Sequence, residues 1–166
     1  MKMNTKKLTV MAMLTAVALI IFMVEAQLPN PSPIPGIKLG LANIITVYAM
    51  FVLGPIPTLM ILLVRVVLGS VFSGQMMILF YSLAGGLLCY ASMLVMRRIV
   101  TQKQIWVCSV IGAIFHNIGQ IAVAIWITRT PALIAYLPVL FVSGICAGLF
   151  TGLCAQYVVN RLPKIL

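Results

Sequence analysis

The chain has 166 residues, of which 63% are hydrophobic and 7% are charged, and its mean hydropathy is +1.20. So few charges cannot cover a water-facing surface, which excludes an ordinary soluble domain and indicates a membrane protein. Glu25 is the only acidic side chain, against eleven Lys and Arg. This excludes enzymes that need several carboxylates, such as those that hold Mg²⁺ on diphosphate and the glycoside hydrolases.

Long apolar segments alternate with short polar ones along the whole chain. A membrane-spanning helix needs about 20 largely apolar residues, and fewer when neighbouring helices shield it. The sequence therefore predicts an all-α, polytopic membrane protein that forms one integral membrane domain over residues 1–166. The six helices that we expect cover residues 8–26, 39–54, 56–73, 76–96, 105–128 and 132–159.

The basic residues predict the orientation of these helices. Eight of the eleven would lie on one side of the membrane: Lys2, Lys6, Lys7, Arg97, Arg98, Lys103, Arg161 and Lys164. Because basic residues favour the cytoplasmic side, we expect both termini in the cytoplasm and a multi-pass protein of the cell membrane. We interpret the net charge of +10 as orientation and contact with anionic lipid headgroups, and expect no nucleic-acid partner.

A proline-rich segment follows the first predicted helix. Residues 27–38 contain Pro29, Pro31, Pro33 and Pro35, which cannot continue a helix and which favour a stiff, extended backbone. We interpret this outer loop as a lid over an outward-facing cavity, and an inert spacer is the alternative. Lys38 and Asn43 follow it directly and are candidate ligand-binding residues.

Arg65 lies near the middle of the third predicted helix. A charge at that depth costs several kcal/mol and usually faces the bundle interior or a wet cavity. We favour a role in binding a carboxylate or phosphate of a substrate. The structural alternatives are hydrogen bonds to free carbonyls or an ion pair with Glu25.

A polar cluster occupies one turn of the fifth predicted helix. His116 and Gln120 are four residues apart and share a helix face, with Asn117 beside them. Interhelical polar contacts in membranes contribute under about 1 kcal/mol on average, so we favour a ligand-facing cluster over a purely structural one. Further candidates for the same cavity are Tyr81, Ser82 and Tyr136.

Small residues and cysteines complete the pattern. Gly144, Gly148 and Gly152 follow one another at four-residue spacing, and we interpret this stripe as packing within the bundle. The cysteines form no C-x-x-C pair and have no histidine at metal-ligand spacing, so we expect no metal and no cofactor.

Four segments carry a resemblance to a known family: residues 35–44, 65–70, 82–86 and 116–120. Together they resemble the family labelled "heptaprenyl diphosphate synthase component I" or "Gx transporter", over residues 6–161. This family is similar to the substrate-binding S components of energy-coupling factor transporters. The resemblance implies a six-helix bundle, a substrate near the outer face beneath the loop between helices one and two, and an A-x-x-x-A contact with a transmembrane coupling subunit, here at Ala12 and Ala16.

Two functions follow from these patterns. The first is a transport subunit that binds a small polar or anionic solute and depends on separately encoded coupling and ATPase subunits, because no G-x-x-x-x-G-K-[ST] loop is present. The second is a non-catalytic membrane accessory protein in isoprenoid, quinone or flavin-linked electron-transfer metabolism, with a lipid-like ligand. A polar, outward-facing pocket would favour the first, and a lateral apolar groove the second. A purely structural anchor would leave Arg65 and His116 unexplained.

Overall fold

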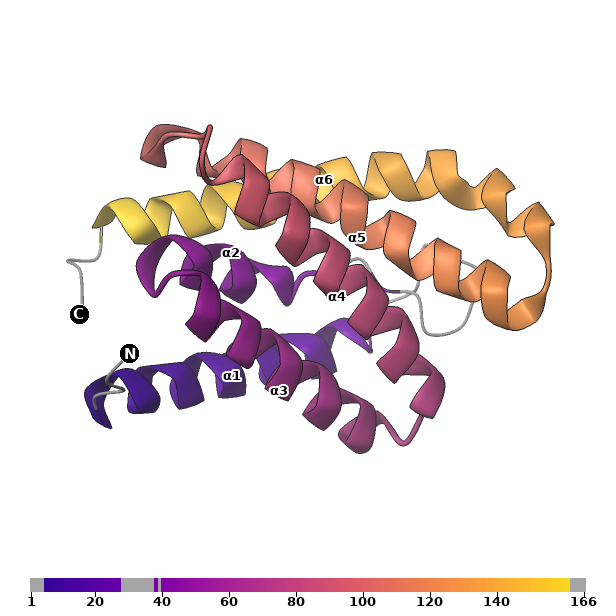
Figure 1. Ribbon diagram of the computed structural model, residues 1–166, viewed down its shortest axis with the longest axis horizontal. Helices are drawn as coiled ribbons and strands as arrows, with labels where there is room; N and C mark the ends of the chain where they lie inside the picture. Colours follow the sequence, from indigo (N-terminus) through magenta and orange to yellow (C-terminus); the bar gives the residue numbers. More distant parts are fainter. Residues whose placement is uncertain (1–4, 28–37, 39, 162–166) are drawn as a thin grey trace.

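The computed structural model describes residues 5–27, 38 and 40–161, and these form an all-helical bundle without a strand (Figure 1). Its elements are α1 (Thr5–Glu25), α2 (Asn43–Val52), α3 (Pro55–Ser73), α4 (Met76–Met96), α5 (Ile105–Thr128) and α6 (Leu137–Arg161), with two short 3-10 turns, η1 (Gln102–Gln104) and η2 (Pro131–Tyr136). The predicted all-α membrane fold is confirmed at this level. The proposed proline lid lies largely outside the described residues.

Five of the described helical segments are long and apolar enough to cross a membrane: α1, α3, α4, α5 and the continuous stretch of η2 with α6. The sixth, α2, has 10 residues, which corresponds to a length of about 15 Å. The prediction of a helix over residues 39–54 was too long. Gly40 has a left-handed backbone with φ of 81° and Gly54 has φ of 92°, so neither residue can continue a right-handed helix.

Glycine and proline set the neighbouring helix ends as well. Pro55 begins α3, where its missing N–H needs no partner, and Gly74 ends the helix with φ of 64°. The last predicted helix, over 132–159, is divided: η2 precedes α6, which runs on to Arg161. The first begins earlier than predicted, at Thr5.

Small residues hold α4, α5 and α6 together. A Cβ atom on Gly119 would lie 2.8 Å from the Ala84 carbonyl oxygen, and one on Gly152 would lie 2.6 Å from the Trp106 Cα. These glycines let α5 approach α4 on one side and α6 on the other. The expected packing role of the glycine stripe in α6 is confirmed.

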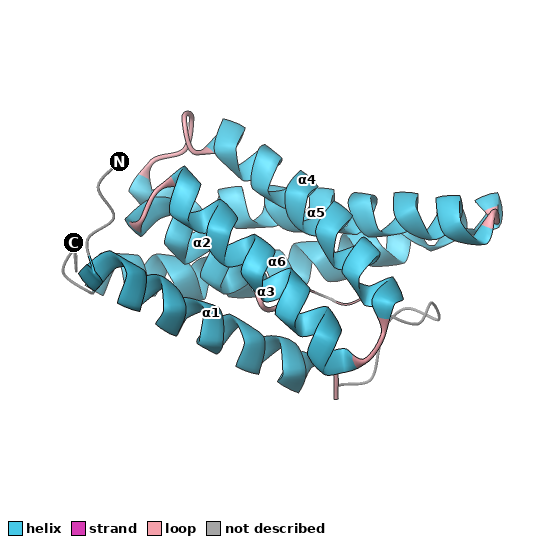
Figure 2. Cartoon of the chain, turned by 60° about the horizontal axis from the view of Figure 1, so that its bottom comes forward, coloured by secondary structure: helices cyan, strands magenta, loops and turns pink. Residues whose placement is uncertain are grey.

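The short α2 lies inside the bundle, and seven of its ten residues are buried. It packs against α6, α3 and α1 (Figure 2). The residues that precede it therefore approach the bundle interior, where they meet the last turn of α1 and the middle of α5.

Candidate functional site

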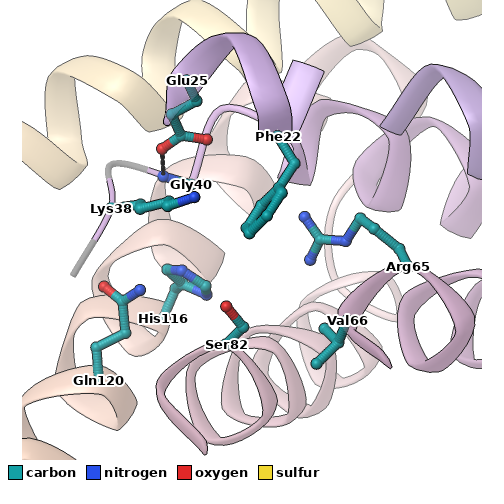
Figure 3. Close-up of a pocket in the computed structure, with 9 residues that line it drawn as sticks. All are labelled: Phe22, Glu25, Lys38, Gly40, Arg65, Val66, Ser82, His116 and Gln120. Carbon is teal, nitrogen blue, oxygen red and sulfur yellow. Dashed lines mark hydrogen bonds between the residues drawn. The ribbon is translucent and has the colours of Figure 1, made fainter. Parts of the chain in front are cut away.

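A small polar cavity lies between α1, α3, α4, α5 and the residues just before α2 (Figure 3). The space that the centre of a water molecule can reach is about 10 Å³, which suits about one bound water. The lining residues are Phe22, Glu25, Lys38, Gly40, Arg65, Val66, Ser82, His116 and Gln120. The cavity therefore joins five of the residues that the sequence singled out, namely Lys38, Arg65, Ser82, His116 and Gln120.

Glu25 ties the end of α1 to the segment before α2. Its carboxylate is buried and its Oε1 accepts a hydrogen bond from the Gly40 N–H at 2.6 Å. Only glycine fits at position 40, because its φ is positive and a Cβ would lie 2.8 Å from Asn43 Nδ2 and 3.2 Å from the His116 ring. The carboxylate thus provides a hydrogen-bond acceptor for the Gly40 N–H, which lies outside the helices and has no helical acceptor.

Lys38 brings the first cation to the cavity. Its Nζ lies 3.5 Å from the centroid of the Phe22 ring, a cation–π contact. This ammonium has no hydrogen-bond partner in the described part of the chain. Burial lowers the pKa of Lys38 below its ordinary value; nearby Glu25 opposes that shift and Arg65 adds to it.

Arg65 brings the second cation. It lies on the buried face of α3 that also carries Ile61, Leu62 and Gly69, at helical spacing. Its Nη2 donates a hydrogen bond to Asn43 Oδ1 at 3.4 Å, while its Nε has no partner among the described residues. The guanidinium is therefore buried, at 5% exposure, and its hydrogen bond to Asn43 within the described part of the chain is long.

Two polar side chains of α5 form the opposite wall. His116 and Gln120 share one face of the helix as predicted, and both point into the cavity in Figure 3. A Cβ on Gly85 of α4 would lie 2.8 Å from the His116 carbonyl oxygen and 3.0 Å from Gln120 Cγ, so this glycine makes room for them. Within the described residues, His116 Nδ1 and Gln120 Oε1 have no hydrogen-bond partners.

Four predicted site residues do not line this cavity. Asn43 accepts a hydrogen bond from Arg65, and Asn117 donates one to the Leu140 carbonyl of α6. Tyr81 is buried in an apolar cluster with residues of α5 and α6, and Tyr136 is exposed in η2. Their part in ligand binding stays a prediction.

Four lining residues were missed as site residues: Phe22, Glu25, Gly40 and Val66. Phe22 and Glu25 are three residues apart and so share a face of α1. The signal was present, because a single carboxylate at the end of an apolar helix requires a buried partner. An ion pair with Arg65 was one structural alternative from the sequence, whereas the carboxylate accepts a hydrogen bond from a backbone amide 15 residues away.

Ala12 and Ala16 lie away from the cavity, on an exposed face of α1. They line a groove between α1 and α3 of about 400 Å³ together with Thr15, Met60 and Val64, among other residues. The face is apolar and shallow, because alanine side chains leave the helix backbone accessible.

The described residues contain no group of three or more His, Cys, Asp or Glu side chains that could hold a metal ion. Cys89 and Cys108 are buried, Cys146 is exposed, and all four cysteines are free thiols.

Comparison with known proteins gives one match. A family model described as heptaprenyl diphosphate synthase component I matches residues 14–158. No curated protein and no solved structure matches the chain.

Proposed function

Because the chain belongs to the heptaprenyl diphosphate synthase component I family, and because its interior holds two buried cations, we propose that it is a membrane-embedded substrate-binding subunit of a transporter. It captures a small polar or anionic organic solute from the outer face. We also propose that it is similar to the S components of energy-coupling factor transporters, and that both of its termini are cytoplasmic.

The observation that carries the proposal is the set of unpaired polar atoms around one cavity. Lys38 Nζ, Arg65 Nε, His116 Nδ1 and Gln120 Oε1 are buried without hydrogen-bond partners among the described residues. Leaving a buried polar group unpaired costs about 1–3 kcal/mol, and more when the group is charged. A bound anionic or polar solute would satisfy them together, because they line the same space from three segments of the chain.

The solute would be recognised by charge first and by hydrogen bonds second. Lys38 and Arg65 would hold an anionic group, with Arg65 offering a planar set of donors. His116, Gln120 and Ser82 would hydrogen-bond other polar groups of the solute. Since the described cavity suits about one water, solute entry requires the wall to open. The segment before α2 is the part of the wall that directly follows the proposed lid in the sequence.

Energy coupling would come from other subunits. The exposed A-x-x-x-A face of Ala12 and Ala16 on α1 is the proposed contact with a transmembrane coupling subunit, whose ATPases are encoded separately. The same helix ends at Glu25 and carries Phe22, so α1 would connect the solute site with the partner face. Neither role involves catalysis by this chain.

One observation favours a second function, that of a non-catalytic accessory protein for an isoprenoid or quinone-type lipid. An apolar groove of about 420 Å³ lies between α1, α2 and α6. It is lined by Val10, Met13, Leu14, Ile44, Ile45, Tyr48, Ala155 and Val158. The family description as component I of a prenyl synthase also implies a companion subunit.

Native mass spectrometry of the protein, extracted gently from its membrane, tests the two functions. We expect wild type to retain a small polar compound that Arg65→Ala loses, because that change removes one of the two cations. Lys103→Gln, an exposed substitution outside the cavity, serves as the matched control and should retain the compound. A long-chain lipid retained equally by all three proteins would reject the binding subunit in favour of the accessory function.

A further inference from the structure

The charges around the cavity are few enough to be counted. Lys38 and Arg65 are cations, and Glu25 is the single carboxylate. Glu25 is counted as a carboxylate, because its Oε1 accepts a short hydrogen bond from a backbone N–H and both cations face the same space. His116 is counted as a neutral imidazole, because a third buried cation beside Arg65 would lack any counter-charge. The cavity therefore carries a net charge of one positive unit.

Nothing else in the sequence can cancel that charge. Glu25 is the only Asp or Glu among the 166 residues, so no other acidic side chain of this sequence can approach the cavity. Its carboxylate is already bound to the Gly40 amide, while Lys38 Nζ and Arg65 Nε lack partners in the described part of the chain. A buried charge without a counter-ion is costly in a membrane, so the balancing charge comes from a bound molecule.

We infer that the solute carries one net negative charge, and that Glu25 sets this number by neutralising one of the two cations. The inference rests on the proposed function and specifies its substrate class. A neutral solute would leave one buried positive charge, and a doubly charged anion would leave one negative charge. Either remaining charge would lower the binding affinity strongly, because electrostatic energies are large where water is excluded.

The geometry also orients such a molecule. Its anionic group meets Lys38 and Arg65. A hydrogen-bonding group meets His116 Nδ1 and Gln120 Oε1 on the opposite wall, which have no partner among the described residues. In Figure 3 the Phe22 ring is drawn between the Lys38 ammonium and the Arg65 guanidinium. The Lys38 ammonium lies 3.5 Å from the centroid of this ring, so Phe22 lies beside the position of the anionic group.

The test changes the charge of the cavity and reads the charge of the bound compound. Wild type, Glu25→Gln and Lys38→Gln are purified in detergent and incubated at pH 7 with the water-soluble small-molecule extract of the expressing cells. Unbound compounds are removed by gel filtration, and retained ones are identified by accurate mass. Gln at position 25 keeps an oxygen that can accept the Gly40 N–H, and a thermal unfolding curve shows whether each variant is folded.

Wild type is expected to retain a compound with one negative charge. Glu25→Gln should weaken its retention relative to doubly charged anions, and Lys38→Gln should lower it at least about tenfold while favouring neutral compounds. Lys103→Gln should match wild type.

Retention of a neutral, cationic or doubly anionic compound by wild type overturns the inference, as does an unchanged preference in folded Glu25→Gln. If such a compound is still lost in Arg65→Ala, the proposed function stands, and only the inference of one net negative charge fails. If wild type retains no compound, the proposed function fails and this inference falls with it.

Discussion

Gly40 is the residue whose identity the site depends on most directly. Its positive φ, its amide bond to Glu25 and its closeness to the His116 ring all occur at one position. These three conditions together exclude every side chain larger than hydrogen. The residue links α1, α5 and the start of α2 without contributing a functional group of its own.

We predict that Gly40→Ala destabilises the protein by about 1–2 kcal/mol from backbone strain, with a further loss from the contact with Asn43 and His116. Gly74→Ala is the matched control, because Gly74 also has a positive φ, but a Cβ there would meet nothing within 4 Å. Thermal unfolding of both variants in the same detergent separates strain from contact. Equal losses of stability would show that the contact with Asn43 and His116 contributes nothing.

At the scale of elements, the sequence predicted the existence of all the long helices and the inward position of Arg65, His116 and Gln120. Hydrophobic length and helical spacing were sufficient for this, because both are local properties. The length of α2 and the bond between Glu25 and Gly40 could not be predicted in the same way. They depend on the path of a non-helical segment, and that path is set by contacts between residues far apart in sequence.

The glycines that bring helices together allow a second prediction, about α4, α5 and α6. Gly119→Ala should push α5 away from the backbone of α4 at Ala84 and Gly85, and so displace His116 and Gln120. Gly152→Ala should disturb α6 against α5 at Trp106 instead, outside the cavity.

Both variants should lose about 1–3 kcal/mol of stability from overpacking, measured by thermal unfolding. Only Gly119→Ala should also lose the retained compound in native mass spectrometry. An equal loss of compound in Gly152→Ala would mean that general loosening of the bundle, rather than the α4–α5 crossing, controls the site.

At the scale of the whole molecule, most of the described basic residues lie at one end of the bundle. The first turn of α1, the last turn of α6 and the connection between α4 and α5 lie at one end, on the left of Figure 1. That end carries the described basic residues Lys6, Lys7, Arg97, Arg98, Lys103 and Arg161. Glu25 and Arg129 lie at the ends of α1 and α5 that point the other way.

This separation supports the proposed orientation and gives a third prediction. Single cysteines are introduced as Lys103→Cys or Arg129→Cys, in a protein whose Cys146 and Cys154 are replaced by alanine. A membrane-impermeant thiol reagent applied to intact cells should label position 129, and should label position 103 only after the cells are broken. The reverse pattern would place the basic end outside and would contradict capture of a solute from the outer face.

The hydrogen bond between Asn43 and Arg65 has a consequence for the order in which the protein is made. Synthesis proceeds from the N-terminus, so α1 and α2 leave the ribosome before α3 does. An arginine at the centre of a lone helix costs about 2.5–3.5 kcal/mol on insertion. When Arg65 enters the membrane, however, Glu25 and Asn43 have already been synthesised. The counter-charge of Arg65 and its hydrogen-bond acceptor are therefore already present in the nascent chain. The helix with the buried arginine is thus inserted only after the groups that compensate its charge have been synthesised.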